Sequence, residues 1–264
     1  MIISVSRRTD VPAYFAEWFF SRLSEGYVEV VSPFNIRLIR YIPLRPDDVD
    51  AFVFWTKNPY PMLDKLNLLK DYHYYFHFTL NPYNNDIEVN LPQLWQRIDT
   101  FKALSDVIGA HRVIWRYDPV LLGGEINIDF HIRNFEEISK RLEGYTEKVI
   151  FSYIDYYKKI EAALKVLNIT TLEHEQKLTV AKNFSKIAHA FGFVIESCSE
   201  NIDLTHYDIS PASCIDARLL ERIIGKTISY KKDKNQRQFC ACAASTDIGM
   251  YKSCRTGCVY CYAK

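Results

Sequence analysis

The sequence predicts an α/β fold built on a parallel sheet, and three observations support this prediction. Short apolar segments alternate with helical ones six or seven times, which is typical of parallel strands joined by crossover helices. Most apolar segments end in polar residues, as barrel strands do at the edge that carries the active site. Five of the seven cysteines lie after Phe239, in a segment of different character. We therefore expect a parallel (β/α) barrel of the TIM type, complete or partial, over 1–225, with a cysteine-rich extension over 226–264 packed on its mouth.

Each strand is predicted from a short apolar run, most often closed by a turn-forming residue. In chain order these runs are 2–6, 27–31, 37–42, 51–55, 73–80, 112–117, 148–153 and 193–196. Ser32, Pro33 and Phe34 close the second run, and an Asn-Pro or Asp-Pro pair ends the runs at 51–55, 73–80 and 112–117. Such pairs favour turns, so they predict where these strands end.

The helices are predicted from the segments that lie between these strands. We expect them at 12–24, 61–70, 91–107, 130–142, 171–190 and 215–224. Asp10 is a candidate N-cap for the first helix, and Gly26 ends it. After 225 the chain becomes polar, with five lysines or arginines against Asp233 between 226 and 238. The simplest interpretation is a solvated connection, although such clusters also bind nucleic-acid backbones.

The composition is that of a globular protein with a large core. Hydrophobic residues make up 48% of the 264 residues and aromatic residues 14%, which argues against disorder. The formal net charge of +1 shows no overall excess of positive charge of the kind that nucleic-acid-binding proteins carry. No run approaches the roughly 18 apolar residues of a membrane span, and the opening residues MIISVSRRTD lack the positive-then-apolar order of a signal peptide. We therefore expect a cytoplasmic protein without a membrane partner, in a compartment that keeps its cysteines reduced.

Polar residues at the carboxyl ends of the apolar runs, or just after them, are the candidate site residues, because parallel barrels build their active sites at the carboxyl ends of the strands. The candidate catalytic residues are Arg7, Asp10, Lys57, Arg116, Asp118 and Glu196. The candidate cofactor-binding residues among them are Asn58, Asn81 and Ser152. Arg116 and Asp118 are two apart on a strand, so they face the same side and could simply form an ion pair.

The last three cysteines, Cys254, Cys258 and Cys261, have the spacing C-x3-C-x2-C, with Tyr260 directly before the last. This spacing lets one short loop place three thiolates around a single centre. Iron–sulfur clusters are normally held by four cysteines, so a set of three leaves one iron open to another ligand. The motif therefore predicts a 4Fe–4S cluster with a vacant coordination position.

These residues resemble the C-x-x-x-C-x-aromatic-C signature of the radical S-adenosylmethionine (radical SAM) superfamily. In that superfamily the open iron binds S-adenosylmethionine, and reduction cleaves it to a 5′-deoxyadenosyl radical. The resemblance implies a lyase or transferase that binds S-adenosylmethionine, with Tyr260 beside the adenine or the cluster. It also implies an electron donor such as ferredoxin or flavodoxin. The superfamily motif follows the first barrel strand, whereas here it comes late in the sequence.

A longer pattern comprises the segments SRRTDVPA, SPFN, WTKNP and WRYDP and the final CxC…STDIGMY…CxxxCxYCYA. This pattern resembles the uncharacterised microbial family catalogued as domain of unknown function 1848. The likeness spans nearly the whole chain, but it implies no reaction.

Four cysteines remain outside the terminal motif: Cys198, Cys214, Cys240 and Cys242. Four thiolates complete either a second iron–sulfur cluster or a tetrahedral zinc site. Cys198 falls at a predicted strand end, and Cys240 and Cys242 form a C-x-C pair that can bind one metal centre. Cys198 and Cys214 could equally be ordinary buried cysteines, which pack as small apolar residues.

Two other functions remain open from the sequence. Zinc is the main rival to iron as the metal of the whole C-terminal segment. The protein could be a non-catalytic nucleic-acid-binding protein that is stabilised by zinc or by an iron–sulfur cluster. The open iron could instead act as a Lewis acid in a hydrolase or lyase that needs no reductant. No G-x-S-x-G elbow, phosphate loop or dinucleotide fingerprint is present, and the substrate, a small molecule or a nucleic acid, is not identified.

Overall fold

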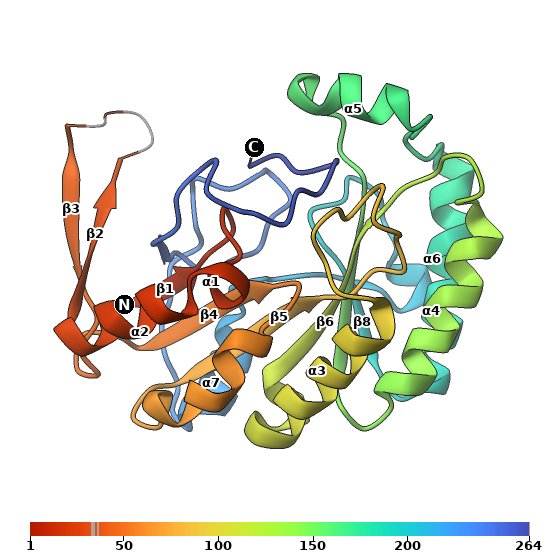
Figure 1. Ribbon diagram of the computed structural model, residues 1–264. Helices are drawn as coiled ribbons and strands as arrows, with labels where there is room; N and C mark the ends of the chain where they lie inside the picture. The colour runs from red at the N-terminus through yellow and green to blue at the C-terminus, as the bar shows by residue number, and fades with distance from the viewer. Residues whose placement is uncertain (33–34, 36, 264) are drawn as a thin grey trace.

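The centre of the molecule is a parallel sheet of eight strands in the order β10-β1-β4-β5-β6-β7-β8-β9 (Figure 1). The computed structural model describes residues 1–32, 35 and 37–263. The strands are β1 (Ile2–Val5), β4 (Ala51–Thr56), β5 (Tyr74–Thr79), β6 (Val113–Val120), β7 (Lys148–Tyr153), β8 (Val194–Ser197), β9 (Ser210–Pro211) and β10 (Thr246–Asp247). All seven strand pairings are parallel, so the predicted α/β class is confirmed.

The sheet is open rather than closed into a barrel. Within the described ranges no ladder joins the edge strands β9 and β10, so the complete TIM-type barrel is not confirmed. Each of these strands has only two residues, which leaves little backbone for closing hydrogen bonds.

Helices flank the sheet at positions close to those predicted from the sequence. They are α1 (Val11–Tyr14), α2 (Ala16–Glu25), α3 (Leu94–Ile108), α4 (Ile128–Leu142), α5 (Glu161–Val166), α6 (His174–Ala190) and α7 (Ala217–Ile224), with 3-10 turns η1 (Tyr60–Leu69), η2 (Ala110–Arg112), η3 (Lys158–Ile160) and η4 (Thr205–Tyr207). Asp10 caps α1 by accepting the Ala13 N–H, and Gly26 ends α2 at φ 80°. The chain breaks between α1 and α2 at Phe15, where one α-helix was predicted.

Segment 61–70 was predicted to be α-helical but forms the 3-10 helix η1. Its buried residues, Met62, Leu66 and Leu69, recur every three or four positions. Either kind of helix can bury such a stripe, so the pattern could not distinguish them.

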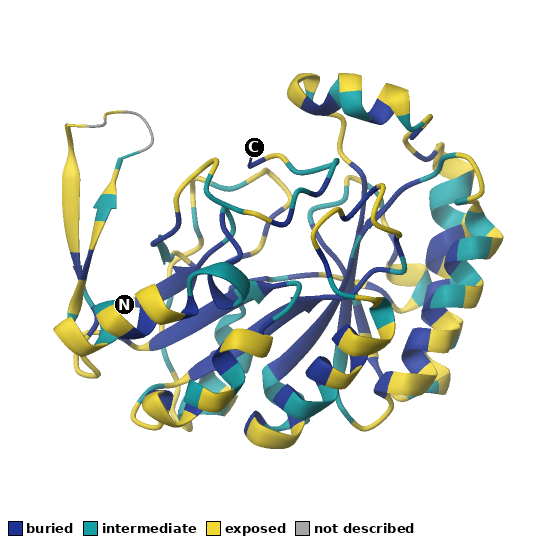
Figure 2. Ribbon diagram, viewed as in Figure 1, coloured by how far each residue is buried: buried dark blue, intermediate teal, exposed yellow. Residues whose placement is uncertain are grey.

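Two predicted strands, 27–31 and 37–42, lie outside the main sheet. They form an antiparallel hairpin of β2 (Tyr27–Val31) and β3 (Ile39–Pro43) that projects from the body and is largely exposed (Figures 1 and 2). The connection between them is too short for a parallel crossover, which needs about a dozen residues or more. The predicted closing residues Pro33 and Phe34 lie outside the described residues.

Alternate residues of the parallel strands pack on opposite faces of the sheet. On the outer face, aromatic side chains pack against the helices: the ring of Trp115 stacks 4.8 Å from Phe135 of α4, which stacks 3.9 Å from Phe184 of α6. The inner face carries side chains such as Val53, Tyr75 and Ile150, which pack with α7 and with buried residues between 198 and 243. The inner core therefore includes the cysteines that precede the terminal motif.

The C-terminal segment is joined directly to the sheet. Strand β10 pairs with β1, and the Asp247 carboxylate accepts hydrogen bonds from Ser4 Oγ (2.8 Å), Ser6 Oγ (2.7 Å) and the Arg7 N–H (3.0 Å). The segment predicted as an extension at 226–264 thus supplies an edge strand. It then crosses above the carboxyl ends of the strands (Figure 1). Among the described helices, none has the length and apolar character needed to span a membrane.

Candidate functional site

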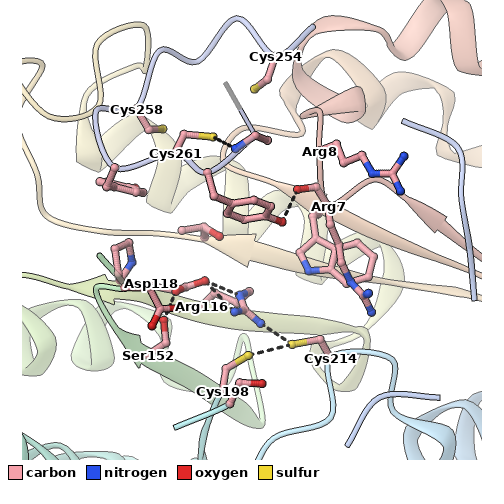
Figure 3. Close-up of a pocket in the computed structure, with 18 of the residues that line it drawn as sticks. Arg7, Arg8, Arg116, Asp118, Ser152, Cys198, Cys214, Cys254, Cys258 and Cys261 are labelled. Atoms are coloured by element: carbon pink, nitrogen blue, oxygen red, sulfur yellow. Dashed lines mark hydrogen bonds and ion pairs between the residues drawn. The ribbon is translucent and has the colours of Figure 1, made fainter. Parts of the chain in front are cut away.

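A cavity of ≈400 Å³ lies at the carboxyl ends of the strands, beneath the C-terminal segment (Figure 3). This volume is within the range of about 300–1,000 Å³ that small-molecule sites occupy. The sequence-predicted residues on its wall are Arg7, Asp10, Lys57, Arg116, Asp118, Ser152, Tyr260 and all seven cysteines. The structure therefore brings together most of the candidate residues from both halves of the chain.

The rim cysteines, defined as Cys254, Cys258 and Cys261, belong to one loop of the C-terminal segment. Segment 87–90 anchors this loop: Asn90 Nδ2 donates to the Arg255 carbonyl (2.8 Å), and the Val259 N–H donates to the Ile87 carbonyl (3.0 Å). On the other side of the loop, the Tyr262 hydroxyl donates to the Arg7 carbonyl (2.8 Å). The loop is therefore fixed from two directions.

A buried polar network holds Tyr260, the residue before the last rim cysteine. Lys57 Nζ donates to the Tyr260 hydroxyl (2.9 Å) and to Glu88 Oε1 (2.8 Å), and the Tyr260 hydroxyl also donates to Glu88. Arg97 Nη1 donates to the other Glu88 oxygen (3.3 Å). Burial alone would raise the pKa of Glu88, but the Lys57 and Arg97 cations bring it below its ordinary value. Glu88 is therefore an ionised carboxylate that ties two cations to the rim loop.

Arg116 and Asp118 form the ion pair that their spacing on β6 allows. Arg116 Nη2 lies 2.7 Å from Asp118 Oδ2, and the Ser152 hydroxyl donates to the other carboxylate oxygen. Burial would raise the pKa of Asp118, but the Arg116 guanidinium lowers it below its usual value. The pair forms a charged wall of the cavity, between β6 and β7.

Asp10 and Arg7 meet the cavity in different ways. The Asp10 carboxylate accepts the N–H groups of Ala13 (3.1 Å) and Lys57 (2.7 Å), and burial raises its pKa to about 6. Asp10 is therefore used mainly to hold α1 against the end of β4. The Arg7 guanidinium lies 5.2 Å from the Trp55 ring centroid, and its buried Nη2 has no hydrogen-bond partner among the described residues.

The inner cysteines, defined as Cys198, Cys214, Cys240 and Cys242, lie deeper, on the inner face of the sheet. They are buried, with exposed fractions of 8%, 6%, 7% and 2%. The Sγ atoms of Cys198 and Cys214 are 3.5 Å apart, and Arg116 Nη1 donates to Cys214 Sγ (2.9 Å). Figure 3 shows Cys198 and Cys214 across the cavity from the rim cysteines.

Thiols are the usual ligands of iron–sulfur clusters, so the rim cysteines suit such a cluster chemically. Their sulfur atoms do not, however, surround one common point. All seven cysteines are free. Over the described part of the chain, no three His, Cys, Asp or Glu side chains already lie together as ligands of one metal ion. The cysteines of a 4Fe–4S cluster bind different iron atoms, so they need not approach one another. Three thiols from one anchored loop, on the wall of one cavity, are a suitable donor set.

Three predicted site residues do not line the cavity: Asn58, Asn81 and Glu196. Asn58 Oδ1 accepts the Tyr60 N–H (3.4 Å) in the turn after β4. Asn81 is fully buried, and its amide pairs with both the N–H and the carbonyl of Asp118. Asn81 Nδ2 also donates to the Tyr260 hydroxyl (3.2 Å) and to Glu88 Oε1 (3.0 Å), so it supports the network behind the cavity wall. Glu196 lies within β8 and pairs with Lys148 (2.7 Å). These polar residues hold strands and turns together rather than facing the cavity.

Sequence reasoning missed the residues that hold the rim loop from outside the motif. Glu88 lies in an irregular loop and Arg97 on α3, and no local pattern marks either of them. Asp247 stood within the STDIGMY segment, but its role as the acceptor for Ser4, Ser6 and Arg7 depends on β10 pairing with β1.

Comparison with known proteins gives one result about the identity of the chain. A search of curated proteins finds no match. Residues 2–263 match the family described as Domain of unknown function (DUF1848). Two segments of the family-like pattern, WTKNP and WRYDP, supply Lys57, Arg116 and Asp118 to the cavity wall. The chain therefore belongs to the DUF1848 family.

Proposed function

We propose that this protein is an iron–sulfur enzyme of the radical SAM type, in which the rim cysteines hold a 4Fe–4S cluster. One observation carries the proposal: Cys254, Cys258 and Cys261 line a cavity whose other walls are the polar strand ends of a parallel sheet. When bound, such a cluster would supply the reductive cleavage of S-adenosylmethionine, with electrons from a donor such as ferredoxin or flavodoxin. We interpret the open sheet as a partial (β/α) barrel, in a reducing cytoplasm that keeps the thiols free.

The chain's first task in this proposal is to hold the ligand loop in place. Tyr260 directly precedes Cys261, so the bonds from Lys57 and Glu88 to its hydroxyl fix the backbone between the last two rim cysteines. Glu88 and Arg97 are buried, and hydrogen bonds between charged groups are strong where little water reaches them. The loop is therefore ordered before any cofactor binds, which reduces the entropy cost of binding.

The second task is to orient a small polar ligand beside the rim cysteines. Asp118 is ionised and lies on the cavity wall, so it suits a cationic group such as an amino group. A ligand with such a group, as the methionine part of S-adenosylmethionine has, would be held at this wall.

The test is reconstitution with iron and sulfide under anaerobic conditions, followed by metal analysis and EPR spectroscopy. We expect about four iron and four sulfide ions at the rim site. With S-adenosylmethionine and dithionite, the protein should form 5′-deoxyadenosine, measured by mass spectrometry. The triple variant Cys254→Ser, Cys258→Ser, Cys261→Ser should lose this activity, whereas Glu137→Gln, on the exposed side of α4, should retain it. A reconstituted protein that binds no iron at the rim, or never cleaves S-adenosylmethionine, would contradict the proposal.

A further inference from the structure

We propose that the inner cysteines bind one zinc ion in a structural site that is separate from the rim cysteines. Four thiolates are the donor set of closed structural zinc sites, which hold the metal without an open position. The inference rests on the geometry and charge around Cys198, Cys214, Cys240 and Cys242. It therefore does not depend on the proposed iron–sulfur chemistry.

The four thiols converge from three separate parts of the chain. Cys198 follows β8, Cys214 lies in the loop before α7, and Cys240 and Cys242 belong to the C-terminal segment. The two latter parts run together, because the Ala243 N–H donates to the Ile215 carbonyl (3.0 Å) and Ser213 Oγ donates to the Ala241 carbonyl (3.0 Å). All four cysteines are free and buried. Four such residues in one cluster are more than simple core packing requires.

The inner cysteines lie close to one another in the fold. Cys198 and Cys214 are 3.5 Å apart at Sγ, and Cys242 Sγ accepts the N–H of Ile215, the residue after Cys214 (3.4 Å). In a tetrahedral site with Zn–S bonds of about 2.3 Å, neighbouring sulfurs are about 3.8 Å apart. A 4Fe–4S cluster places each ligand on a different iron, so its cysteine sulfurs lie further from one another. The short Cys198–Cys214 distance therefore favours a single ion.

The four thiols belong to one buried cluster, but in the described part of the chain they do not yet surround a common centre. Each cysteine has one side-chain torsion, χ1, that moves its sulfur between staggered positions. Zinc would draw the four sulfurs together through these rotations. The result would link the C-terminal segment to the end of β8 and to the loop before α7 through one ion.

The charges around the inner cysteines also suit a metal–thiolate centre. A zinc ion with four thiolates carries a net charge of about −2, which neutral thiols do not. Arg116 Nη1 already donates to Cys214 Sγ (2.9 Å), and the Ile215 N–H donates to Cys242 Sγ (3.4 Å). The Arg7 guanidinium interacts electrostatically with the thiols of Cys242 and Cys214, and its Nη2 lacks a partner among the described residues. The buried Arg116 and the partly buried Arg7 thus place two positive charges beside these thiols.

The experiment uses the rim triple variant Cys254→Ser, Cys258→Ser, Cys261→Ser, so that only the inner thiols remain. We expect about one zinc ion per chain by elemental analysis. Cobalt added in place of zinc should give sulfur-to-cobalt charge-transfer bands and the intense visible bands of tetrahedral cobalt. Adding Cys214→Ser to this background should remove the metal or weaken the charge-transfer bands by roughly one ligand in four.

A second measurement covers the case in which the Cys214→Ser variant does not fold. In the rim triple variant, a chelator should release the zinc and make all four inner thiols reactive toward a thiol reagent. Stoichiometric iron and sulfide in the rim triple variant would overturn the proposal, as would a Cys198–Cys214 disulfide or four reactive thiols without any bound metal. Since the rim variant cannot hold the proposed radical cluster, these results are independent of that proposal.

Discussion

The two groups of cysteines share one cavity but are assembled in different ways. The rim cysteines come from a single loop, and Cys254 and Cys261 are only partly buried. The inner cysteines come from three parts of the chain and are all buried. A set that exists only after folding is suited to stabilising the fold, whereas a local set at a cavity wall is suited to chemistry with a ligand. The predictions below test this difference.

The largest effect is expected at Glu88, which ties the rim loop to the body. Glu88→Gln leaves the buried Arg97 and the largely buried Lys57 without their shared carboxylate, so the free energy of unfolding should fall by about 3–5 kcal/mol. Iron uptake at the rim should fall as well, while zinc at the inner cysteines should persist. Chemical denaturation and metal analysis measure both effects. The exposed control Glu137→Gln should change stability by less than about 0.5 kcal/mol, and an equal loss there would contradict the argument.

Replacing one cysteine from each group compares their contributions to stability directly. Cys242→Ala should cost about 3 kcal/mol, because it breaks a buried site that joins three parts of the chain. Cys261→Ala should cost about 1 kcal/mol, because this side chain is only partly buried. Anaerobic denaturation of the two variants measures the difference. Equal losses would show that the inner cysteines have no special structural role.

One part of the pH dependence of stability should come from the buried His131, and it can be distinguished from the effect of metal release. His131 is fully buried between the Tyr117 hydroxyl (2.8 Å) and the Leu121 carbonyl (2.6 Å), and burial lowers its pKa to about 4. Since the unfolded pKa is about 6.5, the stability that depends on neutral His131 is complete above pH 6.5 and is lost as the pH falls toward 4. The full loss is about 3 kcal/mol.

His131→Gln should remove this part of the acid sensitivity while leaving any loss caused by metal release. The measurement is the free energy of unfolding at pH 7.5 and pH 5 for both proteins. A wild-type protein whose stability falls no more steeply than that of His131→Gln would refute the assignment.

The smallest effect is expected at the ion pair between Arg237 and Asp155, which joins the C-terminal segment to the loop after β7. Both side chains are half exposed, so Asp155→Asn should cost less than about 1 kcal/mol, and added salt should reduce the difference further. Thermal unfolding at low and high salt measures this effect. A large, salt-independent loss would mean that this pair, rather than buried groups, holds the C-terminal segment.

The sequence predicted the parts of the fold that depend on local patterns. The parallel strands β4 to β8 follow from apolar runs between turn-forming pairs, and β7 has the predicted bounds. Strand β6 runs through Asp118-Pro119 to Val120 instead of ending there, because its register shifts between Tyr117 and Val120. The hairpin β2–β3 was not predicted because an apolar run does not reveal its partner strand.

The candidate site was predictable where residue type and strand end coincide, as at Arg116, Asp118 and the rim cysteines. It was not predictable where polar groups meet across the fold. Glu88 and Asp247 are marked by no local spacing, and their roles depend on Tyr260 and on β1, which are distant in sequence. Glu196 was misplaced because it lies inside β8 rather than after it, and there it pairs with Lys148.

The position of β10 changes how the order of the sequence relates to the order of the sheet. Although β10 comes last along the chain, it is the first strand in spatial order, next to β1. One edge of the sheet is therefore formed by the last strand along the chain, beside the first. The loop that carries the rim cysteines begins at this edge, so the two ends of the described chain are held next to each other at the cavity.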